Sequence, residues 1–180
     1  FPIINTDWQY VKLYLSFSFP IILLGFVASY TRSIDKIMLQ MFWGSTSVGV
    51  YALPEKLTVL IFSVSLSASG LLWAANSNLY AKGNFSRMKE ITHKAIKIIL
   101  LIISPVILFL LIFTEEFLTI IFGNDAHLSV ITMRFLLIGC FFNSIRLPYA
   151  TQIISTGHLK IGMLLNLQVL ITNTILNLVF

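Results

Sequence analysis

Six ionisable residues stand inside or directly beside long apolar segments of this sequence: Arg32, Asp35, Lys36, Lys56, Arg134 and Arg146. Charged groups in apolar surroundings are costly, so they usually pair with one another or mark the path of a substrate or an ion. Five of the six are cations, which favours an anionic ligand. We therefore take all six as candidate substrate-binding residues of a cationic cavity.

The spacing of Arg32, Asp35 and Lys36 places the three side chains on one face of a helix, because residues three and four apart are neighbours there. Two interpretations remain open. In the first, these charges line a water-filled path for a charged ligand. In the second, they are ordinary charges near a membrane surface that pair locally, Asp35 with Arg32 or Lys36, and Glu55 with Lys56.

Arg134 and Arg146 are twelve residues apart in one apolar segment, so at least one of them is too deep to reach water easily. No acidic residue in the same segment compensates them. Two such cations indicate an anionic ligand, for example a phosphate or an acidic sugar. The alternative is an ion pair with an acid elsewhere in the full protein.

The composition places these charges in a membrane. Hydrophobic residues make up 57% of the chain and charged residues only 11%, whereas about 25% are charged in an average soluble domain. We predict an all-α, polytopic transmembrane helix bundle, with residues 1–180 forming a single membrane domain. The five predicted helices cover residues 12–43, 46–80, 91–122, 128–155 and 160–180, separated by short segments of Gly and polar residues.

The basic residues give the predicted orientation. The connection between the second and third helices contains a single acid, Glu90, and the cations Lys82, Arg87, Lys89, Lys94 and Lys97. Basic loops stay in the cytoplasm, so we expect the loop at residues 81–90 to be cytoplasmic; the inner, cytoplasmic membrane is the location that the family resemblance described below implies. The net charge of +5 is then an orientation signal, and no nucleic-acid partner is expected.

Motifs of enzymes and cofactor sites are missing from the sequence. It has no zinc-ligand spacing, phosphate-binding Gly-rich loop or nucleophile elbow. Its one cysteine, Cys140, excludes an internal disulfide. We therefore expect no cofactor, no metal and no enzymatic activity.

The segment "SFPIILLGFVASYTRSIDKIMLQMFWGSTSVGVYALPEKL" resembles the opening of the second lobe of polysaccharide flippases in the multidrug/oligosaccharidyl-lipid/polysaccharide exporter superfamily. Three later segments, "LYAKGNFSRMKE", "LTIIFGND" and "ISTGHLKIGMLLNLQVLITNTILNLVF", are similar to its following loops and helices. The positions that carry the first likeness are Pro20, Asp35, Lys36, Gly44, Val48, Gly49, Tyr51, Lys56 and Leu57.

The resemblance implies a carrier that flips lipid-linked oligosaccharide, on a polyprenyl pyrophosphate, across the cytoplasmic membrane by alternating access. The five helices would be the seventh to eleventh of a larger two-lobe transporter, and the partners would be this anionic lipid-linked glycan, membrane lipid and the first lobe of the same chain. A cationic central cavity is common in such proteins. Arg32, Lys36, Arg134 and Arg146 suit it by residue type, and Asp35 and Lys56 match the motif.

Three alternatives belong to other classes. A drug/cation antiporter of the same superfamily would need acids in its cavity, and a membrane enzyme such as a polysaccharide polymerase would need catalytic acids or a large outer loop. A membrane scaffold subunit without transport stays open.

Overall fold

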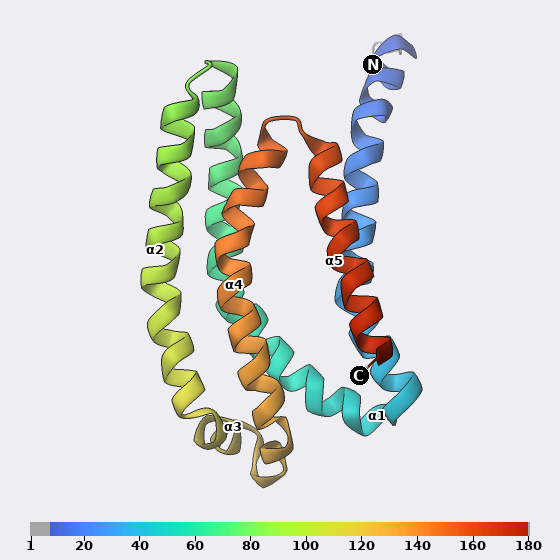
Figure 1. Ribbon diagram of the computed structural model, residues 1–180, viewed down its shortest axis with the longest axis vertical. Helices are drawn as coiled ribbons and strands as arrows, with labels where there is room; N and C mark the ends of the chain where they lie inside the picture. Colours follow the sequence, from blue (N-terminus) through green and yellow to red (C-terminus); the bar gives the residue numbers. More distant parts are fainter. Residues whose placement is uncertain (1–7, 180) are drawn as a thin grey trace, which may run out of the picture. The chain divides into compact units, whose positions relative to one another are not determined.

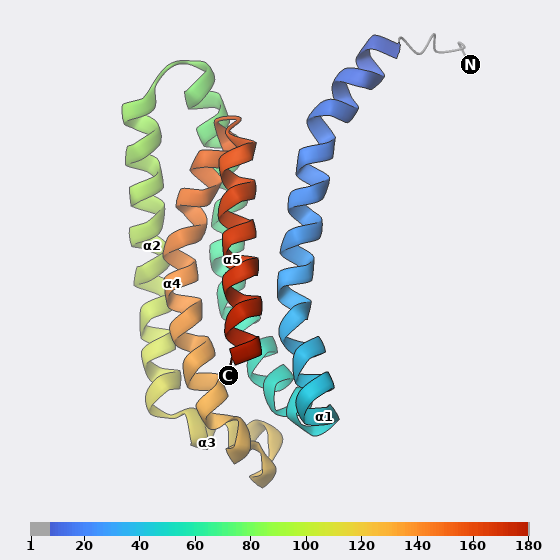
Figure 2. The same cartoon turned by 45° about the vertical axis from the view of Figure 1, so that its right-hand side comes forward.

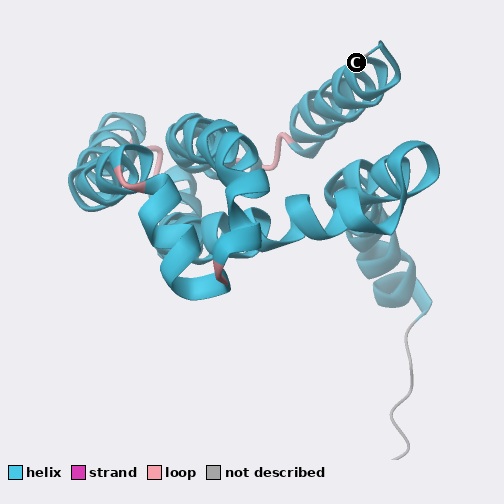
Figure 3. Ribbon diagram, turned by 90° about the horizontal axis from the view of Figure 1, so that it is seen from below, coloured by secondary structure: helices cyan, strands magenta, loops and turns pink. Residues whose placement is uncertain are grey.

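The computed structural model of the protein describes residues 8–179, without the side chains of a few of them, among which are Pro20 and Arg32. The described residues form helices joined by short turns, and no strand occurs among them (Figures 1 and 3). The predicted all-α fold is confirmed. The elements are α1 (Trp8–Ala81), α2 (Phe85–Ile112), α3 (Thr114–Phe122), the 3-10 helix η1 (Asn124–Ser129), α4 (Val130–Ser155) and α5 (Leu159–Val179).

The chain divides into two compact units. A terminal unit combines Phe1–Asp35 with His158–Phe180, and a central unit covers Lys36–Gly157. Three helical segments of the described chain are long and apolar enough to cross a membrane, namely Gly25–Ala81, Phe85–Ile112 and His127–Ser155. The single domain over residues 1–180 stays a prediction.

The helix ends differ from the predicted ones at residues 91–122. Helix α2 begins six residues earlier, at Phe85, where the Asn84 side chain accepts a hydrogen bond from the Arg87 amide at 3.1 Å and caps the helix. The segment is then interrupted at Phe113 (φ −102°, ψ 32°), which separates α2 from the short α3. The apolar run ends at this break, where Thr114, Glu115 and Glu116 follow Phe113, but the prediction continued one helix through these polar residues to Phe122.

Gly44 lies between two arms of α1. Its backbone has φ 79° and ψ −179°, while the residues on both sides are helical. Glycine adopts a positive φ without the steric cost that a Cβ atom brings. The first predicted helix and the second predicted helix therefore correspond to the two arms of this one long element.

Helices α2 and α4 lie side by side in the central unit (Figures 1 and 2). Their buried apolar residues recur every three or four positions, so each helix presents one continuous stripe to the other. The second arm of α1 packs against this contact with its own apolar residues. The centre of the core consists of Ile99, Ile103, Ile107, Met133 and Leu137.

A stripe of small polar residues follows the buried face of the second α1 arm, and we call it the polar seam: Thr58, Ser65, Ser69 and Asn76. The Asn76 amide Nδ2 donates to Thr92 Oγ1 of α2 at 3.4 Å. No hydrogen-bond partner exists within the described chain for Ser65 Oγ, Ser69 Oγ or Asn76 Oδ1. The seam is thus only partly satisfied by its neighbours.

Pro54 leaves one backbone carbonyl group of α1 without its hydrogen bond inside the helix. A proline has no amide proton, so the carbonyl group four residues earlier, on Val50, lacks its intrahelical donor. Ser129, at the end of η1, donates its hydroxyl to that Val50 oxygen at 2.9 Å. This contact joins residues 79 positions apart and ties the second arm of α1 to the start of α4.

We predict that Ser129→Ala lowers the free energy of unfolding by about 1–2 kcal/mol, because it leaves the half-buried Val50 carbonyl without a donor. In a Pro54→Ala background the backbone amide gained at position 54 can bond to Val50, so the same substitution should cost at most about half as much. Unfolding of the four proteins in detergent micelles measures both costs. Ser47→Ala, which removes an exposed hydrogen bond to the Trp43 carbonyl, is the matched control, and equal Ser129→Ala costs in the two backgrounds would contradict the assignment.

Candidate functional site

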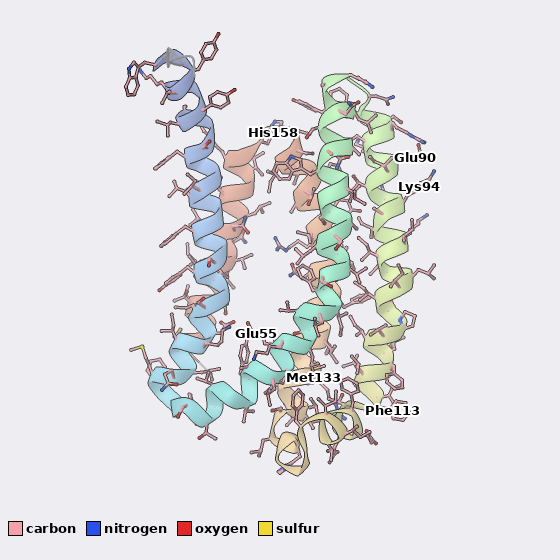
Figure 4. The ribbon with its side chains drawn as sticks, turned by 180° about the vertical axis from the view of Figure 1, so that it is seen from behind. Glu55, Glu90, Lys94, Phe113, Met133 and His158 are labelled. Carbon is pink, nitrogen blue, oxygen red and sulfur yellow. The ribbon has the colours of Figure 1, made fainter. Side chains whose placement is uncertain are left out.

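Lys36 and Glu55 form an ion pair across the Gly44 bend. The Lys36 ammonium lies 3.1 Å from Glu55 Oε1 and 3.0 Å from Oε2, so both carboxylate oxygens accept from it. The two side chains are 38% and 21% exposed, which leaves the pair accessible from one side. Figure 4 shows Glu55 on the α1 segment that follows the bend.

This pair corrects the local pairing predicted from the sequence. Glu55 contacts Lys36, nineteen residues earlier, and not its neighbour Lys56. Consecutive residues on a helix point about 100° apart and do not face each other, so exposed Lys56 takes another direction. Asp35 is half-buried in the terminal unit, and the side chain of Arg32 lies outside the described part of the chain.

Arg134 and Arg146 both lie on exposed faces of α4. The buried face of this helix consists of other residues, Val130, Met133, Leu137, Cys140, Ser144, Pro148 and Thr151. Arg146 Nε donates to Asn143 Oδ1 at 3.0 Å on the same helix. The two arginines are separated by about 18 Å along the axis and about 120° around it. They therefore stand at different heights and directions, outside the core of the central unit.

The described contacts do not gather the candidate residues into one cluster. Lys36 is paired with Glu55, while Lys56, Arg134 and Arg146 make no ion pair among the side chains that the structure describes. These three exposed cations of the central unit therefore have no acidic side chain beside them among the described contacts. Such groups can attract an anion or an acid from another part of the protein.

A family model for MatE matches residues 20–179. The chain belongs to the MatE family. This MatE protein is a multi-pass membrane protein of the multidrug/oligosaccharidyl-lipid/polysaccharide exporter superfamily, whose members are transporters, and the likeness noted in its sequence is confirmed at that level. Comparisons with curated proteins and with solved structures gave no match.

Sequence reasoning missed a contact between α2 and α4 in this MatE chain. The ring of His93 meets that of Tyr149 edge-on, with centroids 5.8 Å apart and planes at 82°. His93 Nδ1 also donates to the Lys89 carbonyl oxygen at 2.9 Å. The spacing of Lys89, His93 and Lys97 indicates that the three lie along one side of α2, but nothing in the sequence identifies Tyr149 as the neighbour.

For the ion pair, we predict that Lys36→Glu lowers the free energy of unfolding of the MatE protein by about 1 kcal/mol, because two partly solvent-screened carboxylates then face each other. Exchanging the two charges, in Lys36→Glu/Glu55→Lys, should recover more than half of that loss. Lys56→Glu is the matched control and should cost less than Lys36→Glu. Unfolding in micelles gives the three values, and an exchange variant no more stable than the single variant would refute the pairing.

Proposed function

We propose that the protein flips a lipid-linked oligosaccharide, carried on a polyprenyl pyrophosphate, from one membrane leaflet to the other by alternating access. The observation that carries the proposal is the pair of arginines on open faces of α4, on a helix with no acid. Arginine suits a pyrophosphate because its planar guanidinium donates two parallel hydrogen bonds to phosphate oxygens.

The physical task of such a carrier is to replace lost hydration. Each polar group of a sugar or phosphate that enters hydrocarbon without a hydrogen bond costs several kcal/mol. A hydrated groove with cations at two heights offers successive partners to the anionic headgroup, while the prenyl chain stays in lipid. Arg134 and Arg146 stand at two heights of α4 and point in different directions, so a headgroup that contacts both must also move around the helix as it crosses.

The acids of the described chain favour this substrate class over a drug or cation. Glu55 is held by Lys36, and Glu90 is held by Arg87 and Lys94. Glu115 and Glu116 are exposed in the first turn of the short α3. Asp35 and Glu55 are half-buried and no acid is fully buried among the described residues, whereas a cation carrier needs acids in its cavity.

The same proposal includes an orientation in the cytoplasmic membrane. The turn between α1 and α2 together with the first part of α2, residues 82–97, carries five of the nine Lys and Arg residues of the central unit, and basic loops remain on the cytoplasmic side. The region of α3, with its two acids, then faces outward. A glycan assembled in the cytoplasm would be taken up at the α1–α2 end and released at the α3 end.

We predict that Arg146→Ala reduces surface polysaccharide at least about tenfold, because one charge-assisted hydrogen bond to phosphate is lost. Arg146→Lys should keep part of the activity, since lysine keeps the positive charge but cannot donate the two parallel hydrogen bonds of a guanidinium group. Arg87→Ala, which removes an exposed cation of the Glu90 pair, is the matched control. Flipping of a fluorescent polyprenyl-pyrophosphate glycan in liposomes provides the direct assay, and full activity of a well-expressed Arg146→Ala variant would contradict the proposal.

We predict that a cysteine at Ser86 reacts with a membrane-impermeant maleimide only after the cells are permeabilised. Asn84 is avoided because its side chain caps α2. A cysteine at Glu116, exposed in α3, should react in intact cells and serves as the control for the opposite side. Both are introduced after replacing the buried Cys140. Labelling of the Ser86 cysteine in intact cells, with the Glu116 cysteine labelled only after permeabilisation, would contradict the proposed orientation.

A further inference from the structure

We infer that Lys89 and Lys97 of α2, with Tyr149 of α4, bind the headgroup of an anionic phospholipid. The two lysines lie on the same flank of α2 as His93, because residues four apart turn only about 40° around a helix. The contact between His93 and Tyr149 shows that this flank borders α4. The lysines are about 12 Å apart along the axis, within reach of one headgroup between their flexible side chains.

The charges on α2 fall into two groups that differ in partners. Glu90 accepts from Arg87 at 2.7 Å and from Lys94 at 2.7 Å. Figure 4 shows Glu90 and Lys94 on the side of α2 that faces away from the other helices of the central unit. Lys89 and Lys97 are exposed and have no acidic partner among the described residues. This flank therefore carries two uncompensated positive charges.

The length of the apolar part of α2 places this flank at the depth of lipid headgroups. The segment 98–113 contains no charged residue and spans about 24 Å as a helix, against a hydrocarbon core of about 30 Å. Lys97 is the first charge outside that segment. The boundary between hydrocarbon and headgroups thus lies near Lys97, and Lys89 lies beyond it.

Aromatic residues mark the same level on the neighbouring helices. Tyr149 of α4 and Trp73 and Tyr80 of α1 are all partly exposed on helices beside this end of α2. Tyrosine and tryptophan concentrate where hydrocarbon meets headgroups, because their rings are apolar and their polar ends need water or a headgroup. The hydroxyl of Tyr149 is therefore placed to donate to a lipid phosphate beside the two lysines.

An anionic phospholipid is the occupant that these observations favour. Its phosphate is fixed at the depth of the lysines, and its acyl chains fit the exposed apolar side chains Ile98, Leu101 and Ile102 that follow on α2. Lysines near a membrane surface attract such lipids without needing a shaped pocket. The inference does not depend on the transported substrate, so it holds or fails separately from the proposed flipping activity.

The experiment uses the purified full-length protein in nanodiscs of phosphatidylcholine with increasing phosphatidylglycerol, read out by bound lipid in native mass spectrometry and by melting temperature. The Lys89→Gln/Lys97→Gln variant should need about tenfold more phosphatidylglycerol for half-occupancy. Tyr149→Phe should show a smaller shift. Arg87→Gln/Lys94→Gln loses the same net charge from the group paired with Glu90, and should stay within about twofold of the unchanged protein.

Two results would overturn the inference. Equal losses in the two double variants would show that net charge alone attracts the lipid. Displacement of the lipid by millimolar inorganic phosphate would show a site for free phosphate and not for a lipid headgroup. Because a misfolded variant could imitate a loss, each variant must keep the helical circular dichroism of the unchanged protein, and one that does not is replaced by the single substitutions Lys89→Gln and Lys97→Gln.

Discussion

Backbone groups inside a membrane must find their hydrogen-bond partners within the protein, since hydrocarbon supplies none. In the central unit this constraint acts most sharply at Val50, whose carbonyl loses its donor to Pro54 and is bonded by Ser129 from η1. The bond requires the end of η1 to lie against the second arm of α1. Through it, a local defect in α1 is tied to the residue that directly precedes α4.

Packing in this unit follows from the same environment. Lipid chains are as apolar as leucine, so helices associate through close contact and a few polar bonds and not through exclusion of water. The buried stripes of α2 and α4 provide the close contact, and Asn76, Ser77 and Ser129 provide bonds from one element to another. The large apolar residues on the outer faces, such as Leu101 and Phe135, are exposed because lipid is their natural neighbour.

The fold class was accessible from the sequence because it depends on the lengths of apolar runs and on the turn residues between them. The bend at Gly44 was marked by its glycine and the polar residues around it. The interruption at Phe113 was marked as well, because the apolar run ends there and Thr114, Glu115 and Glu116 follow. The prediction of one helix over residues 91–122 passed over this signal because the apolar residues at 117–122 resume the pattern. The site was less accessible because its contacts join distant segments. Lys36 meets Glu55 across nineteen positions, and only the three-dimensional arrangement shows that this cation is paired with an acid while Arg134 and Arg146 are open.

The partly satisfied seam of α1 has a mechanical consequence. The second arm is fastened near one end by the Ser129 bond and near the other by the Asn76 bond. Between them, Ser65 and Ser69 offer oxygens to which nothing in the described chain donates. Between the two bonds the arm is therefore held against α2 and α4 chiefly by the packing of Ile61, Phe62, Val64 and Ala68, a contact that, unlike a hydrogen bond, has no preferred direction.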